Sequence, residues 1–268
     1  MTKIAILGAA GRMGRMLVAE AAGADGIKLA AALECAGNGA IGSDAGVLAG
    51  LPAPLGVAVA AASGPVAADV FIDFTFHTAV PSNLALAAAS GARGYVLATT
   101  GLDAAEETAV AEAAARFPIV RAANMSLGVN LLLGLVRRAA SLLDATYDIE
   151  LVEMHHRHKK DAPSGTALML AKAAAEGRGA NLDDVAVYGR KGMVGERPQG
   201  EIAVHALRGG SVVGDHTVMF AGDVERVEIT HKAQSREAFA AGALRAAQWT
   251  AGRAPGLYTM RDVLGFNR

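Results

Sequence analysis

Hydrophobic and polar positions follow two different patterns, which divide the sequence near its middle. In the first half, short apolar runs alternate with alanine-rich segments of helical length, a pattern typical of parallel β-α-β units. The predicted strands are Lys3–Leu7, Lys28–Leu33, Val70–Thr75, Tyr95–Thr99 and Ile119–Ala122. The predicted helices are Gly11–Ala22, Val80–Ala89 and Ala104–Arg116. Because such strands need helices on both faces to bury them, this half predicts a layered α/β domain.

From about Tyr147, apolar and polar residues alternate along several segments, as expected for a sheet that is covered on one face. The predicted strands are Tyr147–Met154, Glu201–Arg208, Val212–Ala221 and Val224–His231. Gly214-Asp215 is a candidate turn within the third of these, and Gly222-Asp223 predicts a hairpin before the fourth. Arg236–Ala251 is predicted as one long closing helix.

These patterns predict two domains in a fold of the α/β class. The first is Rossmann-like, with a parallel sheet that binds a dinucleotide, and takes residues 1–126, completed by residues 237–268. The second is an α+β domain on a mixed or antiparallel open sheet, and takes residues 127–236. We find no internal repeat and no low-complexity linker between them.

Composition narrows the class of protein. The 268 residues carry a formal net charge of −1, which gives no basic footprint for nucleic acid. The single Cys35 cannot form an intrachain disulfide, and no secretion signal follows Met1, so we expect a cytoplasmic protein. The longest helical apolar stretch, Leu127–Val136, is too short for a bilayer, so no membrane span is predicted.

The first predicted strand runs into a glycine-rich turn at Gly8, Gly11 and Gly14. Glycines at such a turn let the backbone approach a pyrophosphate, whose charge is met by amides at the start of the next helix. The spacing G-x-x-G-x-x-G also fits an ordinary tight turn. Glu34, about 20 residues further on at the end of the second strand, favours cofactor binding because an acid there accepts hydrogen bonds from an adenine ribose. A carboxylate also repels a 2′-phosphate, which favours NADH over NADPH.

Two later loops, Ala98–Gly101 and Ala122–Ser126, follow predicted strands of the same sheet. Open α/β sheets bind ligands at the carboxyl ends of their strands, so these loops are candidates for the nicotinamide end. Taken separately, their small and polar residues are equally well explained as plain strand-to-helix turns.

The segment His155–Lys160 places three histidines among three formal cations. We reject a metal site, since the cations repel a divalent ion and neither a cysteine nor a helical His pair with an acid accompanies them. An anion is the expected ligand. Ser164 is placed to cap a helix that begins near Gly165, whose amide and that of Thr166 suit a carboxylate. Histidine also donates protons near neutral pH, so one of the histidines is a candidate general acid.

These residues resemble the 4-hydroxy-tetrahydrodipicolinate reductase (dihydrodipicolinate reductase) family over the whole chain. The similarity is carried by Gly8–Gly14, Asp73–Thr75, Thr99–Gly101, Ala123–Ser126 and, above all, Glu153–Thr166. The resemblance implies NAD(P)H-dependent reduction of a cyclic, unsaturated dicarboxylate to tetrahydrodipicolinate in the diaminopimelate route to lysine. It also implies a cytoplasmic homotetramer assembled through the sheet of the second domain, which binds the substrate.

The resemblance assigns roles to individual positions. His155 is expected to donate the proton, and Lys159 to bind substrate and stabilise developing charge. His156, Gly165 and Thr166 are expected to bind a substrate carboxylate. Residues expected to bind NADH, or less favourably NADPH, are Gly8, Ala9, Ala10, Gly11, Arg12, Met13, Glu34, Ala98, Thr99, Thr100, Ala122, Ala123, Asn124 and Met125. No step requires a metal.

The sequence departs from the family pattern at two positions. Cys35 stands where many relatives carry an arginine that meets the 2′-phosphate of NADPH, and Ala98 replaces a common glycine. Arg12 is placed to compensate in part for the first change, so use of both cofactors stays open. Two alternatives remain: another two-domain amino-acid or semialdehyde dehydrogenase, which leaves His155–Thr166 unexplained, and a non-catalytic NAD(H) sensor, for which no effector region is visible.

Overall fold

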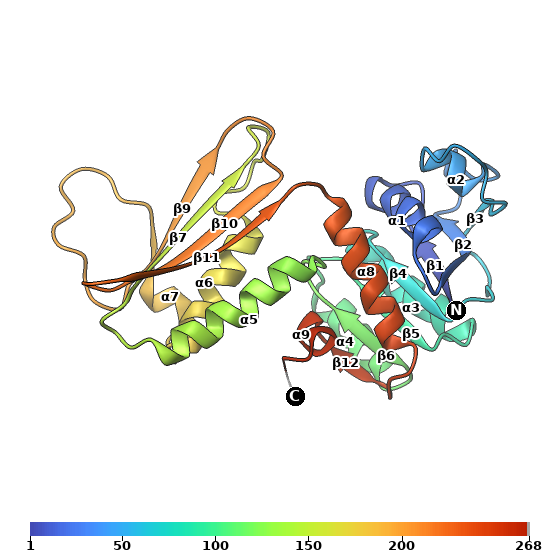
Figure 1. Ribbon diagram of the computed structural model, residues 1–268. Helices are drawn as coiled ribbons and strands as arrows, with labels where there is room; N and C mark the ends of the chain where they lie inside the picture. The colour runs from blue at the N-terminus through green and yellow to red at the C-terminus, as the bar shows by residue number, and fades with distance from the viewer. Residues whose placement is uncertain (267–268) are drawn as a thin grey trace. The chain divides into compact units, whose positions relative to one another are not determined.

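The computed structural model describes residues 1–266, which form two compact units (Figure 1). Unit 1 takes in Met1–Leu127 and the chain from Glu237 onward, and unit 2 is Gly128–Arg236. Unit 2 is therefore inserted between two segments of unit 1. No helix within residues 1–266 is long and apolar enough to cross a membrane.

Unit 1 is built on a seven-stranded sheet in which every pair of neighbouring strands is parallel. In spatial order the strands are β12 (Gly256–Tyr258), β6 (Pro118–Arg121), β5 (Gly94–Leu97), β4 (Val70–Asp73), β1 (Thr2–Leu7), β2 (Ile27–Glu34) and β3 (Val59–Ala61). The parallel α/β fold predicted from the sequence is thus confirmed. The three-residue strands β3 and β12 were not predicted. The apolar run around β3, residues 57–62, is mostly alanine, which has low strand propensity, and β12 has no apolar run of strand length.

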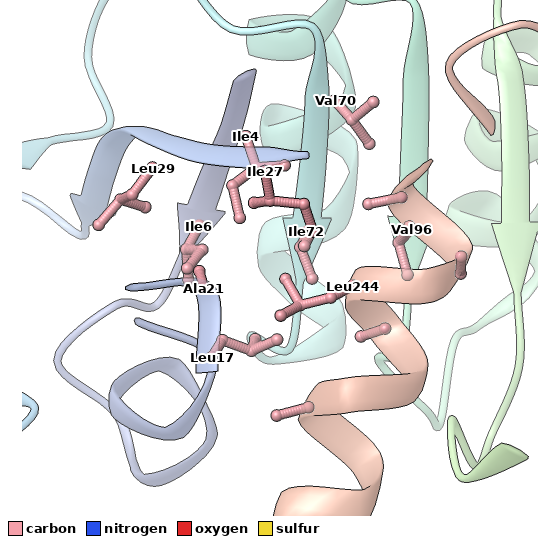
Figure 2. Close-up of a cluster of buried hydrophobic side chains, with 14 of the residues drawn as sticks. Ile4, Ile6, Leu17, Ala21, Ile27, Leu29, Val70, Ile72, Val96 and Leu244 are labelled. Atoms are coloured by element: carbon pink, nitrogen blue, oxygen red, sulfur yellow. The ribbon is translucent and has the colours of Figure 1, made fainter. Parts of the chain in front are cut away.

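Alternate residues of these strands face opposite layers of helices. Ile4 and Ile6 face a core formed with α1 (Arg12–Gly23) and α8 (Glu237–Thr250). Figure 2 shows this core, with Leu244 of α8 placed against the strands. Ala5 and Leu7 face the other core, formed with α3 (Val80–Ala89) and α4 (Ala104–Ala114). Shorter helices complete the unit: α2 (Ala45–Leu48), η1 (His77–Ala79) and α9 (Met260–Leu264).

The predicted closing helix is α8, and it packs closely against the end of the loop that follows β6. A Cβ atom at Gly242 would lie 1.8 Å from the carbonyl oxygen of Met125, so only glycine fits there. Ala240, Ala243 and Ala247 of the same helix are completely buried. The last part of the chain therefore supplies a core element of the unit that begins at the N-terminus.

Unit 2 is built on a five-stranded mixed sheet. Its spatial order is β11 (Arg226–Ala233), β10 (Gly214–Ala221), β7 (Asp148–His155), β9 (Ile202–Arg208) and β8 (Ala186–Tyr188). Helices α5 (Leu127–Leu142) and α6 (Gly165–Gly177) contribute to one core with these strands, and α7 (Leu182–Val185) lies beside it (Figure 1). β7 pairs parallel with β9 and antiparallel with β10, which confirms a mixed sheet.

One turn prediction in unit 2 is wrong. Gly214 and Asp215 are the first two residues of strand β10, where they pair with Ala233 and Lys232 of β11. The alternation of buried and part-buried residues along β10 is unbroken, so the glycine serves packing and not chain reversal. The predicted hairpin at Gly222-Asp223 does join β10 to β11, and the amide of Gly222 donates a hydrogen bond to the carbonyl of Glu225.

Candidate active site

The glycine turn after β1 has the backbone that a close approach requires. Gly8 has a φ angle of +70°, which residues with a side chain rarely adopt. At Gly14, a Cβ atom would lie 2.1 Å from the carbonyl oxygen of Gly8, so α1 begins directly against the turn. These two positions explain why the sequence has glycines there, independently of any ligand.

Some amides of this turn have hydrogen-bond partners within residues 1–266, and others are left for a ligand. The amide of Ala9 donates to Leu33 at 3.0 Å, and that of Ala10 donates to a carboxylate oxygen of Glu34 at 2.8 Å. Helix α1 begins after Gly11 without a side-chain cap, and its first turn holds no acidic residue. Its first amides, beginning with Arg12 and Met13, therefore form the positive helix end that a phosphate needs. Arg12 is exposed.

Glu34 ends β2 beside this turn and is only 8% exposed. Besides Ala10, it accepts hydrogen bonds from the amide of Cys35 at 3.2 Å and from Nδ2 of Asn38 at 3.1 Å. The carboxylate is thus fixed at the carboxyl end of the sheet, where the sequence pattern predicted an acid for ribose binding.

A cavity of about 590 Å³ opens at this end of the sheet. It brings together four of the predicted cofactor residues: Gly8, Ala10, Gly11 and Glu34. It lies where the strand order reverses between β1 and β4, the usual ligand position in open α/β sheets. The sequence analysis did not predict the other side of the cavity, which consists of Phe74, Thr75, Phe76, Thr78, Ala79, Ser82 and Asn83.

A buried carboxylate, Asp73, holds that other side in place. It is fully buried at the end of β4 and accepts from the Thr75 hydroxyl at 2.7 Å and from Asn83 Nδ2 at 3.0 Å. It also accepts from Tyr95, at 2.6 Å, and this contact together with burial raises the pKa of that phenol well above its usual value. Because the Thr75 amide donates to the Asp73 side chain instead of to a neighbouring strand, β4 ends before the predicted Thr75.

The first of the two predicted nicotinamide loops joins the same network. Thr99 is 6% exposed, and its hydroxyl lies 3.2 Å from Asp73 and 3.0 Å from the Thr75 carbonyl. Ala98 donates to the Asp73 carbonyl, and Thr100 is exposed. None of these three residues lines the 590 Å³ cavity.

The second loop follows β6 and also lies outside the cavity lining. The amide of Ala122 donates to the carbonyl of Leu97, which places this loop beside the first. Ala123 and Asn124 are the next residues of the chain. Met125 is 1% exposed and belongs to the core. Its side chain therefore serves packing.

In unit 2, strand β7 places Glu153 and His155 on one face, two residues apart. Glu153 has no exposed surface, and one of its oxygens lies 2.6 Å from Nδ1 of His155. Burial alone would raise the pKa of Glu153, but hydrogen bonds from Arg208, His155 and the Ser164 amide lower it. Glu153 is therefore an ionised carboxylate directly behind the histidine.

Arg208, at the end of β9, forms a bidentate pair with Glu153 at 2.8 and 2.9 Å. The same guanidinium donates to the carbonyl of Asp161 at 2.6 Å, which fixes the loop before α6. The Ser164 amide donates to Glu153 at 3.0 Å, and its hydroxyl caps α6 by accepting from the Ala167 amide at 3.1 Å. The cap predicted at Ser164 is thus present.

A second buried histidine lies beside the first. His216 of β10 packs edge-on against His155, with ring centroids 5.2 Å apart, and its Nε2 lies 3.2 Å from the Ser164 hydroxyl. Burial, followed by the nearby His155, lowers the pKa of His216 to about 4. His216 is therefore neutral near pH 7.

The remaining predicted substrate residues lie in the loop before α6 and in the first turn of that helix. Lys159 pairs with Asp161 at 2.9 Å, and His156 accepts the Lys159 amide at its carbonyl. Burial, with smaller effects from neighbouring cations, lowers the pKa of His156. Gly165 is exposed with no atom within 4 Å of where a Cβ would lie, and Thr166 follows it in the first turn.

Sequence reasoning gave no role to Glu153, Arg208 or His216. Glu153 and His155 differ by two positions on a strand, which was a usable signal for a shared face. Arg208 and His216 lie 53 and 61 positions beyond His155, so only the sheet register brings them to it. Within residues 1–266, no group of three or more His, Cys, Asp and Glu side chains is placed to hold a metal ion.

Comparison with known proteins accounts for both units. Residues 2–125 match the family model "Dihydrodipicolinate reductase, N-terminus", and residues 128–264 match "Dihydrodipicolinate reductase, C-terminus". The 4-hydroxy-tetrahydrodipicolinate reductase of Anaeromyxobacter dehalogenans strain 2CP-C is 51% identical over 267 residues, covering 99% of this chain and 98% of the relative. That of Parvibaculum lavamentivorans is 52% identical over 265 residues, covering 98% and 97%.

A solved structure gives the same answer for the fold. Dipicolinate-bound dihydrodipicolinate reductase from Paenisporosarcina sp. TG-14 superposes with a TM-score of 0.73 at 23% identity, over 97% of both chains. At 23% identity, this similarity shows a shared fold. The two family models and the relatives that are about 50% identical show the family. This chain therefore belongs to the dihydrodipicolinate reductase family, also called 4-hydroxy-tetrahydrodipicolinate reductase.

Proposed function

We propose that this protein reduces 4-hydroxy-tetrahydrodipicolinate, or its dehydrated form, to tetrahydrodipicolinate with NAD(P)H, in the diaminopimelate route of lysine biosynthesis. Family membership gives the reaction class. The observation that carries the proposal is the buried pair of Glu153 and His155, followed by a cationic loop and a capped helix start. This set supplies a proton donor and a carboxylate site, which reduction of a cyclic dicarboxylate requires in addition to the hydride from the nicotinamide.

Residues of unit 1 fit a dinucleotide. The turn at Gly8 and Gly14 leaves backbone room, α1 offers uncapped amides, and Glu34 lies in the adjoining cavity. When bound, the nicotinamide supplies a hydride to the substrate ring. The chain holds the cofactor through Gly8–Met13 and Glu34, with the loops Ala98–Thr100 and Ala122–Met125 expected at the nicotinamide end.

Residues of unit 2 fit the substrate and the protonation step. His156, Gly165 and Thr166 bind a substrate carboxylate at the start of α6, and Lys159 adds positive charge beside it. His155 then gives a proton to the ring carbon next to the one that was reduced. A fixed cation and a positioned acid both favour this step, because charge develops on the ring before the proton arrives.

We infer that NADH is used in preference to NADPH. Glu34 puts a negative charge beside the expected ribose, and Cys35 brings no cation to that position. A 2′-phosphate there is repelled. Arg12 follows Gly11 directly and is exposed, but it is not among the described residues that line the cavity.

The test is loss of the reduced-nicotinamide absorbance with freshly generated substrate, with NADH and NADPH run side by side. Faster turnover with NADH supports both the reductase and the interpretation of Glu34 and Cys35. Faster turnover with NADPH keeps the first and contradicts the second. Binding of both cofactors without turnover contradicts the reductase, and a different dehydrogenase or an NAD(H) sensor then takes its place.

Assembly and location are further parts of this proposal. One face of the unit 2 sheet packs on α5 and α6, while Leu207 of β9, on the other face, is 49% exposed. We propose that this other face joins four copies into a homotetramer in the cytoplasm. Light scattering after gel filtration should give four times the chain mass of 27.2 kDa, and a monomer mass would contradict the tetramer.

A further inference from the structure

Both oxygens of Glu153 are occupied by donors from three elements. Oε1 accepts from the Ser164 amide at 3.0 Å and from Arg208 Nη2 at 2.9 Å. Oε2 accepts from His155 Nδ1 at 2.6 Å and from Arg208 Nη1 at 2.8 Å. We propose that Glu153 is the positioning residue of the proton donor, which it holds in one tautomer and at a fixed distance from the start of α6. This inference rests on the proposed function.

The tautomer follows from the chemistry of the contact. An ionised carboxylate only accepts hydrogen bonds, so Nδ1 of His155 carries a proton whether the ring is charged or neutral. Nε2 is then the atom that gives its proton away. In this step the Nε2–H bond breaks and its electron pair stays on nitrogen. The new C–H bond takes its electron pair from the C=C bond of the electron-rich ring that hydride arrival leaves.

The product of that step is a neutral ring with its remaining proton on Nδ1, the tautomer that Glu153 binds. Of the two neutral tautomers, Glu153 therefore favours the one that exists after proton transfer. Nε2 makes no hydrogen bond within residues 1–266 and lies against Gly214, where a Cβ atom would be 2.9 Å away. The donating nitrogen is thus left without a competing partner.

The same carboxylate sets a spacing. It binds the amide of Ser164, which immediately precedes the exposed Gly165 at the proposed carboxylate site. Arg208 extends the connection to the Asp161 carbonyl. The end of β7, the end of β9 and the start of α6 therefore meet at Glu153, and a substrate bound at α6 is held at a fixed distance from Nε2.

The test is the Glu153→Gln variant. The new side chain has only one oxygen. We expect that oxygen at the position of Oε1, where Arg208 and Ser164 donate, so that the NH₂ group faces His155 Nδ1. The neutral ring must then accept at Nδ1 and carry its proton on Nε2. Long-range ¹⁵N–¹H spectra of histidine-labelled protein at alkaline pH, with His155 assigned through a His155→Asn variant, distinguish the two tautomers.

We expect the Nδ1–H pattern in the unsubstituted protein and the Nε2–H pattern in Glu153→Gln. Turnover should fall roughly 10²-fold, as when an acid or base loses its orienting partner, while NADH affinity stays unchanged. A structural role alone would not change the tautomer. An Nε2–H pattern in the unsubstituted protein, or normal turnover in Glu153→Gln, would overturn the inference.

Glu150→Gln is the matched control. Glu150 lies on the same strand and also accepts from a histidine and from arginines: His205 at 2.7 Å, Arg190 at 3.0 Å and Arg197 at 2.9 Å. It faces the opposite side of the sheet from Glu153. Its loss removes comparable ion pairs, yet the His155 spectrum should be unchanged.

A folding failure is handled by a second variant. If circular dichroism shows that Glu153→Gln is unfolded, Glu153→Asp keeps the charge on a side chain shorter by one methylene. It should keep the Nδ1–H pattern and lower turnover, and normal turnover in this variant overturns the spacing part of the inference. If the unsubstituted protein has no reductase activity, the proposed function fails, and the tautomer measurement still decides the role of Glu153.

Discussion

Two buried carboxylates organise the two candidate sites, and each is saturated by donors. Asp73 joins the turn after β4, helix α3 and strand β5, while Glu153 joins β7, β9 and the start of α6. A buried carboxylate is tolerated only when its oxygens are paired, so each fixes the positions of its partners. The side chains expected to contact ligands are thus held in place by carboxylates to which no ligand contact is assigned.

His155→Ala should lower kcat by about 10²- to 10⁴-fold, the usual contribution of a general acid. Its NADH dissociation constant, from fluorescence titration, should stay within about twofold because His155 belongs to the other unit. His158→Ala is the matched control, as His158 lies exposed in the same loop. Turnover of His155→Ala close to that of the control would remove His155 from the mechanism.

Cys35→Arg should lower the KM for NADPH roughly tenfold, since one charge-assisted contact to a phosphate is worth about 1.5 kcal/mol. Cys35 lines the cavity next to Glu34, so the new guanidinium can reach the 2′-phosphate. The KM for NADH should barely change, and Cys35→Ser serves as the uncharged control. An unchanged NADPH value would assign the choice of cofactor to another cation, with Arg12 the first to test.

At the scale of elements, the two proposed anion sites both lie at helix starts. α1 begins uncapped against a glycine turn, whereas α6 begins with a capping serine whose own amide is held by Glu153. Both present backbone donors and a positive end. The difference is one of support, because α1 is held by close packing and α6 by a hydrogen-bond network.

Gly14→Ala should weaken NADH binding at least tenfold, because its Cβ would lie 2.1 Å from the Gly8 carbonyl and would displace the turn. Gly23→Ala, on the same helix, is the control: no atom lies within 4 Å of its Cβ position. That variant should bind NADH normally and gain up to about 1 kcal/mol of stability from the better helix former. Isothermal titration calorimetry measures the NADH affinity of both variants, and equal affinities would contradict the packing argument.

The sequence was sufficient for elements with a clear period and insufficient for contacts between distant strands. Both ends of the helix Val80–Ala89 were predicted correctly, and the parallel direction of the strands followed from the alternation of strands and helices. Gly214-Asp215 was misinterpreted as a turn because composition alone does not separate a packing glycine from a turning one. The network around Glu153 depends on register between β7, β9 and β10, which no local pattern encodes.

At the scale of the molecule, buried histidines make stability depend on pH. The folded state holds the pKa of His216 at about 4, against 6.5 for an unperturbed histidine. Below pH 6.5 the unfolded chain gains a proton there that the folded chain does not, so the stabilisation present above pH 6.5 is lost progressively toward pH 4. Over that range, protonation of His216 in the unfolded chain should lower the free energy of unfolding by about 3 kcal/mol.

Urea unfolding at several pH values, with His216→Gln as the comparison, measures this effect. The variant should be less stable at pH 7 but should lose less stability between pH 6.5 and pH 4.5. His156 and His231, whose pKa values are also lowered mainly by burial, contribute in both proteins and cancel in the comparison. Parallel curves for the two proteins would show that His216 does not titrate in this range.

The interrupted layout of unit 1 has a consequence for synthesis in the cell. The ribosome makes the first 127 residues early, but α8, whose Leu244 and alanines fill one core of that unit, emerges more than 100 residues later. Unit 2 is continuous, so all of its strands are available before α8 exists. The nascent chain can therefore complete the second unit first, while the N-terminal strands wait with one face of their sheet covered only in part, by α1.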